Sequence, residues 1–210
     1  MDLSNEKGLT WLAGLAEDLR AAAPAYEPLI VGAAARDLLL HYGLGVPIGR
    51  ATADVDLAFG VRDWEDFGAL REALLASSRF APLERSEHRL VHRGAMPIDL
   101  IPFNGVERPD GTIHWPADDS VMGVLGYREA WASSIKVVLP NEQMLLCVSL
   151  PMLALLKLLA WKDRHTRAPR KDSSDLFLIL VNYLAGENAD CLYAEAPHLL
   201  EKDDFDYELA

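Results

Sequence analysis

The sequence predicts an α/β (α+β) protein with a mixed sheet flanked by helices and a helical bundle at its C-terminal end. Two observations carry this. Short apolar runs alternate with segments of helical period up to about residue 140. After Ser149 the pattern becomes helical only. We therefore expect two parts, a core with an N-terminal helix over 1–140 and a C-terminal helical region over 141–210.

The N-terminal elements follow from periodicity and from glycine and proline. Leucines and alanines at helical spacing predict a helix within 4–22. A buried strand over 28–31 runs into Gly32, and residues 33–42 have helical character. This is the pattern of a strand–turn–helix unit, and 43–49 follows as a Gly-rich loop.

The middle of the chain predicts the rest of the sheet. An apolar strand over 50–59 ends at Gly60, and Asp63 is a suitable N-cap for the next helix. The remaining predicted elements are a strand at 80–83, a hairpin of 89–92 and 97–103 closed at Arg93-Gly94, a loop over 104–120, a helix over 127–132 and a last strand over 134–139.

The C-terminal part predicts two helices. One runs from about 150 to 164, with a proline in its first turn, and another runs from Asp172 or Ser173 to about 184. The acidic tail beyond residue 190 is weakly patterned.

Composition indicates a globular protein. The chain has 210 residues, of which 50% are hydrophobic and 25% charged, with a net charge of -12. Such an acidic chain is not expected to present a broad nucleic-acid surface, so any such contact needs a local patch. The one concentrated basic patch consists of Arg164, His165, Arg167, Arg170 and Lys171; a solvated loop is the alternative.

Targeting signals and cysteines point to the cytoplasm. No signal-peptide pattern follows Met1, and no apolar run reaches membrane-spanning length. Cys147 and Cys191 show no metal-ligand spacing, so we expect reduced core thiols rather than a disulfide. No membrane partner is expected.

Three aspartates stand in apolar strands. In a strand over 50–59, alternation places Asp54 and Asp56 on one face, and Asp99 lies in a later predicted strand. Adjacent carboxylates repel, so a divalent cation, Mg²⁺ or Mn²⁺, is the usual reason to build such a group. The alternatives are a solvated edge strand for the pair and a solvent-facing hairpin residue for Asp99.

A second feature is the small-residue turn after the first strand. Gly32 and Ala33 would let backbone N–H groups approach a phosphate at a helix N-terminus. Tight packing of helix on sheet is the alternative. Arg36 could pair with Asp37 or reach a nucleotide.

These residues together resemble the nucleotidyltransferase core of the DNA polymerase β superfamily: Val31-Gly32-Ala33, Arg36-Asp37, then Thr52-x-Asp54-x-Asp56. The run Val31 to Leu40 is also close to the signature of tRNA CCA-adding enzymes. Two further segments, 155–164 and 170–176, resemble the K-x-x-A…R…K-D-x-x-D-L pattern of AbiEii/AbiGii toxin-like nucleotidyltransferases. The match covers roughly 28–185.

The resemblance implies a metal-dependent enzyme that moves a nucleoside monophosphate from an NTP to an acceptor hydroxyl and releases pyrophosphate. It makes tRNA the first acceptor to test and a protein side chain the second. It also implies a cognate antitoxin as a possible partner. It implies that Asp54, Asp56 and Asp99 hold two Mg²⁺ or Mn²⁺ ions, Asp99 also serving as a base. Lys157 would join the three aspartates as a catalytic residue. Nucleotide contacts would come from Gly32, Ala33, Arg36, Thr52, Lys157, Asp172 and Asp175. Ala33 departs from the family pattern, which has Gly or Ser there.

Simpler roles exist for the C-terminal residues. Lys157 could face the cleft or extend to solvent from a leucine-rich helix, and Asp172 and Asp175 could be a cap and a first-turn charge. Two other functions also fit: a catalytically silent nucleotide-binding module, and a small-molecule nucleotidyltransferase of the antibiotic-modifying kind.

Overall fold

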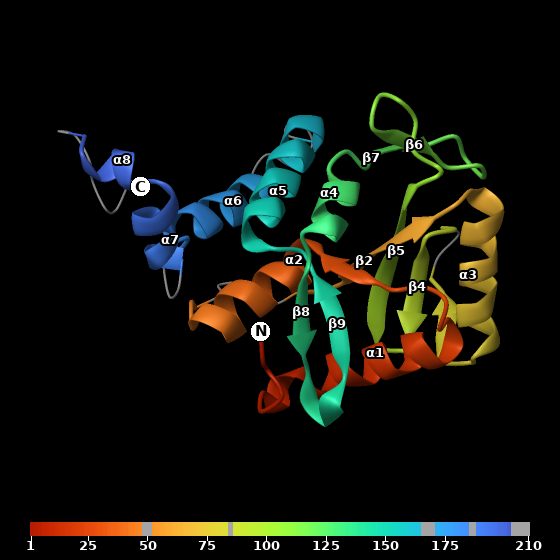
Figure 1. Ribbon diagram of the computed structural model, residues 1–210. Helices are drawn as coiled ribbons and strands as arrows, with labels where there is room; N and C mark the ends of the chain where they lie inside the picture. The colour runs from red at the N-terminus through yellow and green to blue at the C-terminus, as the bar shows by residue number, and fades with distance from the viewer. Residues whose placement is uncertain (48–51, 84–85, 165–170, 185–187, 203–210) are drawn as a thin grey trace.

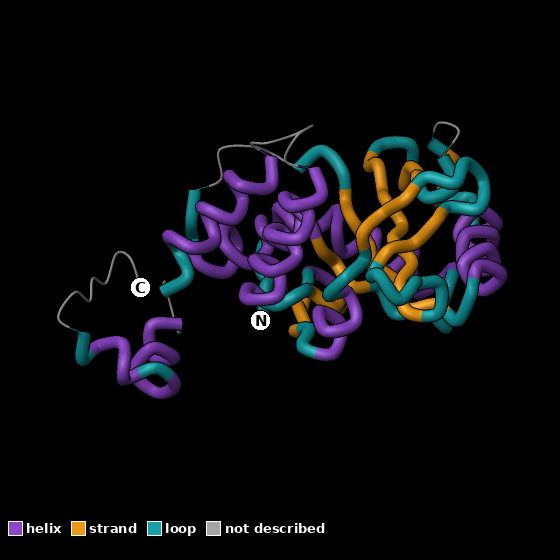
Figure 2. Tube along the Cα trace, turned by 90° about the horizontal axis from the view of Figure 1, so that it is seen from above, coloured by secondary structure: helices purple, strands orange, loops and turns teal. Residues whose placement is uncertain are grey.

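A mixed seven-stranded sheet forms the centre of the computed structural model, which describes residues 1–47, 52–83, 86–164, 171–184 and 188–202 (Figures 1 and 2). The strand order is β3-β4-β5-β2-β1-β9-β8. Its strands are β1 Leu29–Val31, β2 Val55–Val61, β3 Phe80–Pro82, β4 Arg89–His92, β5 Met96–Asn104, β8 Ile135–Val138 and β9 Met144–Cys147. The pairs β1–β9 and β2–β5 are parallel and the others antiparallel, which confirms the predicted fold class.

Helices pack around this sheet, and the last two of them extend away from it (Figure 1). They are α1 Thr10–Ala22, α2 Gly32–Arg36, α3 Trp64–Ala76, α4 Tyr127–Ala132, α5 Leu150–Arg164, α6 Lys171–Val181, α7 Asn188–Glu195 and α8 Pro197–Leu200. A π-helical turn, Asp37–Gly43, continues α2, and short 3₁₀ turns occur at Lys7–Leu9 and Pro140–Glu142. Within the described residues, no helix has both the length and the apolar character needed to cross a membrane.

The strand that carries the acidic pair is shifted from its predicted position. β2 begins at Val55, so Asp54 lies in a bend immediately before it, and residues 50 and 51 are outside the described part of the chain. The strand also passes through Gly60 and ends at Val61, because β5 pairs with it along this length. A Cβ at Gly60 would be 2.7 Å from the Trp131 ring, so this glycine accommodates the close packing of α4.

The strand β9 was not predicted, and β8 is therefore not the last strand. β9 lies between β1 and β8 in the sheet. Its apolar sequence, buried from Leu145 to Cys147, has no alternation that would separate a buried strand from a helix. β9 lies beyond residue 140, where the sequence predicts the boundary between two domains, and that division stays a prediction.

The region expected to be one long loop, 104–120, contains a strand. β6 (Thr112–His114) pairs with β7 (Val121–Gly123) in a second, two-stranded sheet. Trp115 is buried and contacts the rings of Trp64 and His88. Its role in the described structure is packing.

From Leu150 onward the described chain is helical, as predicted, but the predicted region over 141–210 also contains the strand β9. α6 begins at Lys171 and ends at Val181, and the weakly patterned tail contains α7 and α8. Residues 165–170 of the basic patch lie outside the described residues. Cys147 is a buried free thiol whose pKa is raised by burial, while the side chain of Cys191 is outside the described part.

Candidate active site

The three aspartates lie at one end of the central strands. Asp56 of β2 and Asp99 of β5 are direct neighbours in the parallel register. Alternation places Asp99 on the same face as Phe103, whose ring is 5.5 Å from that of Trp131 in α4. The helix therefore covers this face at the far end of β5, while Asp56 and Asp99 remain partly exposed at the near end.

Gly32 places the start of α2 against Asp56. It follows β1, in which Val31 is the register partner of Asp56, and its φ is +67°. A Cβ at this position would overlap Asp56 Oδ2 and lie 2.8 Å from the carboxyl carbon. Only glycine therefore allows the backbone to approach the carboxylate this closely. Ala33, the next residue, is buried.

Arg89 is a site residue that the sequence analysis missed. It is the register partner of Asp99 across the β4–β5 hairpin, and its Nε donates to Asp99 Oδ1 at 2.8 Å. Its Nη2 is 3.9 Å from Asp54 Oδ2. The predicted hairpin was the feature from which this pairing could have been inferred. The predicted two-residue turn would have placed Ile98 opposite Arg89, whereas the three-residue turn over 93–95 places Asp99 there.

The donor chemistry of this site suits a hard divalent cation. Asp54, Asp56 and Asp99 offer carboxylate oxygens, the ligands that Mg²⁺ and Mn²⁺ prefer. Among the described residues, however, no three His, Cys, Asp or Glu side chains are arranged so that they could hold a metal ion. The residue types and their positions on the sheet fit a divalent cation. Side-chain movement is needed to bring the carboxylate oxygens together around it.

Four of the predicted nucleotide contacts belong to a buried ionic network. Lys157 Nζ of α5 donates to Asp175 Oδ2 of α6 at 2.6 Å and lies 3.6 Å from Asp172 Oδ1. Arg36 of α2 donates to the other oxygen of Asp175. All four side chains are less than 10% exposed, so Lys157 neither faces an open cleft nor extends to solvent. Asp172 lies in the first turn of α6, whose first residue is Lys171, and is not its N-cap.

The ionic network determines the protonation of its members. Burial raises the pKa of Asp175, but the hydrogen bond and charge of Lys157, followed by those of Arg36, outweigh it and leave the pKa lowered. Burial likewise opposes the charge of Arg36, and its carboxylate partners raise its pKa overall. Both groups are therefore charged at neutral pH.

Asp37 connects this network to the loop before β2. It accepts from Arg36 Nε at 2.8 Å through Oδ1, and from the Thr52 hydroxyl through Oδ2. Thr52 stands two residues before Asp54. The C-terminal helices are thus linked, through Arg36 and Asp37, to the segment that carries the first aspartate.

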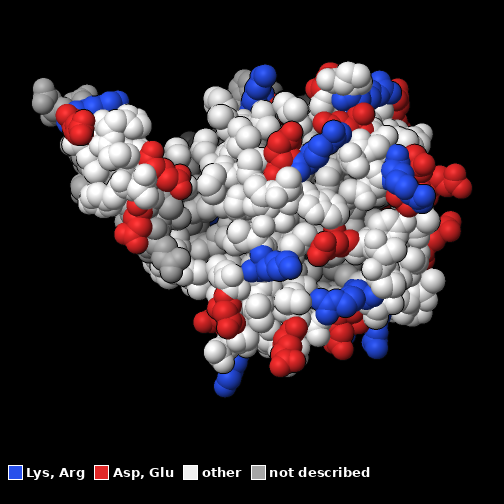
Figure 3. Space-filling view, in the orientation of Figure 1, with Lys and Arg blue, Asp and Glu red and all other residues white. Residues whose placement is uncertain are grey.

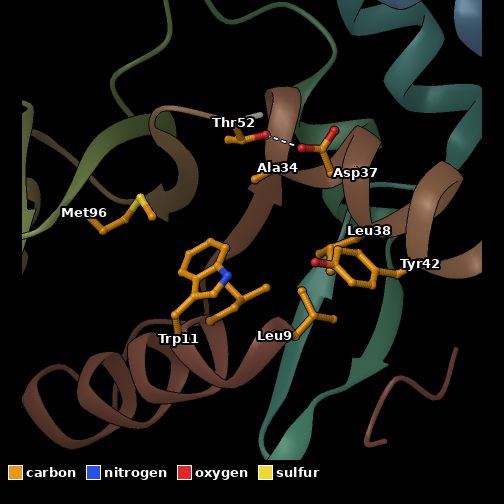
Figure 4. A pocket seen from close by; sticks show the side chains of 9 residues that line it. Leu9, Trp11, Ala34, Asp37, Leu38, Tyr42, Thr52 and Met96 are labelled. Carbon is orange, nitrogen blue, oxygen red and sulfur yellow. Dashed lines mark hydrogen bonds between the residues drawn. The ribbon is translucent and has the colours of Figure 1, made fainter. Parts of the chain in front are cut away.

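A cavity of about 220 Å³ lies beside this link (Figure 4). Asp37 and Thr52 form its polar end, and the rings of Trp11 and Tyr42 point into it. The rest of the lining is apolar: Leu9, Leu12, Ala34, Leu38 and Met96. Because none of the three aspartates lines it, we place the candidate site at the carboxylates and not in this cavity.

Comparison with known proteins supports the fold. No family model matches the chain, and no curated protein is similar to it in sequence. An antigenic nucleotidyltransferase-like protein from Paracoccidioides brasiliensis is 21% identical with a TM-score of 0.56, over 94% of this chain and 92% of that one. The antibiotic-resistance factor ANT(2'')-Ia is 19% identical with a TM-score of 0.48, over 90% of this chain and 92% of its own. The first of these two structures shows that the chain has a nucleotidyltransferase-like fold, as the resemblance implied. The narrower likeness to AbiEii toxins has no support beyond the sequence motifs.

Proposed function

We propose that the protein is a metal-dependent nucleotidyltransferase that moves a nucleoside monophosphate from an NTP to an acceptor hydroxyl. The observation that carries the proposal is the register of Asp56 with Asp99, beside a glycine that admits no side chain. Carboxylates placed side by side repel one another unless a cation or proton joins them. The fold independently supports the same class of activity.

In this proposal the acceptor oxygen attacks the α-phosphorus, the bond to the bridging oxygen breaks, and pyrophosphate leaves. Asp54, Asp56 and Asp99 would hold two Mg²⁺ or Mn²⁺ ions, which supply charge stabilisation for an in-line displacement. Asp99 would also accept the proton of the acceptor hydroxyl. The backbone N–H groups of Gly32 and Ala33 would orient the triphosphate.

The other proposed nucleotide contacts already have carboxylate partners in the protein. Arg36 and Lys157 are both engaged by Asp175, so a phosphate would have to compete with that carboxylate. Thr52 is engaged by Asp37. We therefore infer that Arg36, Lys157, Asp172 and Asp175 act first by fixing α2 on the C-terminal helices, which positions Gly32 for the nucleotide.

The acceptor is proposed from charge and resemblance. Acidic and basic side chains are intermixed on the face seen in Figure 3, and the net charge is -12. A tRNA end requires little basic surface, so tRNA is the first acceptor to test and a protein side chain the second. A role as the toxin of a toxin–antitoxin pair rests on the AbiEii-like motifs alone. An acidic chain would equally suit a cationic small molecule.

The test is transfer of label from each of four α-labelled NTPs, with Mg²⁺ or Mn²⁺, into tRNA, total protein, a panel of aminoglycosides and the enzyme itself. We expect label in one acceptor class, lost in the Asp54→Ala/Asp56→Ala variant. Asp63→Ala is a matched control, because it removes a carboxylate that caps α3 instead.

Two results would redirect the proposal. Metal-dependent NTP binding without transfer would favour the silent nucleotide-binding module. If calorimetry detects no NTP binding and no acceptor takes up label, nucleotidyl transfer by this site is refuted.

A further inference from the structure

Arg89 contacts two of the three carboxylates of the candidate site. Its guanidinium donates to Asp99 at 2.8 Å and lies 3.9 Å from Asp54, so it stands between two of the three carboxylates. The side chains of Arg89, Asp54 and Asp99 are 29%, 30% and 21% exposed. Arg89 and its two carboxylate partners are therefore at the surface of the site, where the arginine can turn without leaving a buried charge unpaired.

A guanidinium and a divalent cation compete for the same lone pairs. A carboxylate oxygen that accepts from Nε at 2.8 Å is blocked for a metal on that side, and a fixed positive charge nearby repels a second one. Among the described residues, these three carboxylates are not arranged as a metal-binding group. In addition, a triphosphate offers arginine a bidentate anionic partner in place of the carboxylate.

We propose that Arg89 is an internal competitor for the metal site: it neutralises Asp99 and Asp54 in the nucleotide-free protein and moves to the triphosphate when cations bind. This inference rests on the proposed function. It makes metal binding depend on nucleotide, because the NTP supplies the guanidinium with its second partner. Arg89 is a positioning residue for the carboxylates in the free protein and a phosphate contact in the complex.

The proposal is tested by Mn²⁺ titration, followed by electron paramagnetic resonance, of the full chain without nucleotide and then with each NTP. Arg89→Gln should bind Mn²⁺ about two- to fivefold tighter than the wild type without nucleotide, because an exposed ion pair is worth up to about fivefold in affinity. Arg89→Lys keeps the charge and should bind less tightly than Arg89→Gln. The enhancement of Mn²⁺ affinity by NTP should be smaller in Arg89→Gln than in the wild type.

Arg20→Gln is the matched control, because Arg20 is bonded to Gln143 and to Met144 of β9, which is separated from β2 by β1 in the sheet. It should leave Mn²⁺ affinity unchanged. Unchanged or weaker Mn²⁺ binding in Arg89→Gln, with binding still lost in Asp99→Asn, would overturn the inference and leave the metal site intact. Mn²⁺ binding indifferent to Asp56→Asn and Asp99→Asn would overturn both the inference and the metal site.

Discussion

Gly32 is the residue whose identity the site depends on most directly. Its positive φ and the absent Cβ allow the start of α2 to touch the Asp56 carboxylate. An alanine would combine backbone strain with a steric overlap that only movement of Asp56 could relieve.

We expect Gly32→Ala to lower the free energy of unfolding by about 1–3 kcal/mol and to weaken metal-dependent NTP binding. Denaturant unfolding and calorimetry measure the two effects. Gly68→Ala is the control, because Gly68 lies in α3 and a Cβ there meets nothing within 4 Å; it should stabilise by up to about 1 kcal/mol. Equal stability of the two variants would contradict this account of Gly32.

Asp18 predicts how stability changes with pH. This carboxylate of α1 accepts from Arg93 Nε and lies against His92 Nε2, each at 2.7 Å. Burial raises the pKa of Asp18, but its hydrogen bonds to Arg93 and His92 outweigh burial and the pKa is lowered below 3.8.

Because the folded pKa of Asp18 is depressed, its contribution is complete above about pH 5 and is lost as pH falls through the folded pKa. Asp18→Asn should cost about 1–3 kcal/mol at pH 7, and the difference from the wild type should shrink below about pH 4. Thermal unfolding across pH 3–8 checks this. A difference that stays constant over that range would rule out the ionised carboxylate as its source.

At the level of elements, the ionic network joins α2 to α5 and α6. Lys157 and Arg36 each bond a different oxygen of Asp175. Removing one member leaves a buried charge without its partner, which costs more than the intact pair contributes.

Lys157→Met should destabilise the protein by about 3–5 kcal/mol. Lys157→Met combined with Asp175→Asn should cost less than the sum of the single changes, because the second substitution removes the stranded charge. A double-mutant cycle of unfolding free energies measures this coupling. Additive effects would show that the two side chains do not interact in solution.

At the scale of the whole molecule, the last two helices are peripheral. α7 and α8 pack chiefly on each other, and α8 contains no buried residue (Figure 1). The core, by contrast, is one continuous cluster from Leu3 to Ile179.

A chain ending at residue 184 should therefore keep its melting temperature within about 2 °C of the full chain, since little burial is removed. It should also keep the metal-dependent NTP binding of the intact protein. A larger fall in melting temperature would show that residues beyond 184 stabilise the core in solution.

Local features of the sequence predicted much of this fold. The Asp63 cap and the helix at 127–132 are confirmed, and so is the hairpin of β4 and β5, with a turn one residue longer than the predicted Arg93-Gly94 turn. Each depends on residues a few positions apart, which act the same way in any tertiary context. The strand β9 was missed because a short apolar run without alternation is compatible with either a buried strand or a helix.

The chemical types at the site, and most of the elements that carry them, could be predicted from the amino-acid sequence, because periodicity, caps and glycine turns are local. Which side chains meet depends on the tertiary structure. Arg89 faces Asp99 because one extra turn residue sets the register. Arg36 meets Asp175, 139 residues away, because α6 packs on α2. Such long-range pairing depends on how all the elements pack together, which no local pattern records.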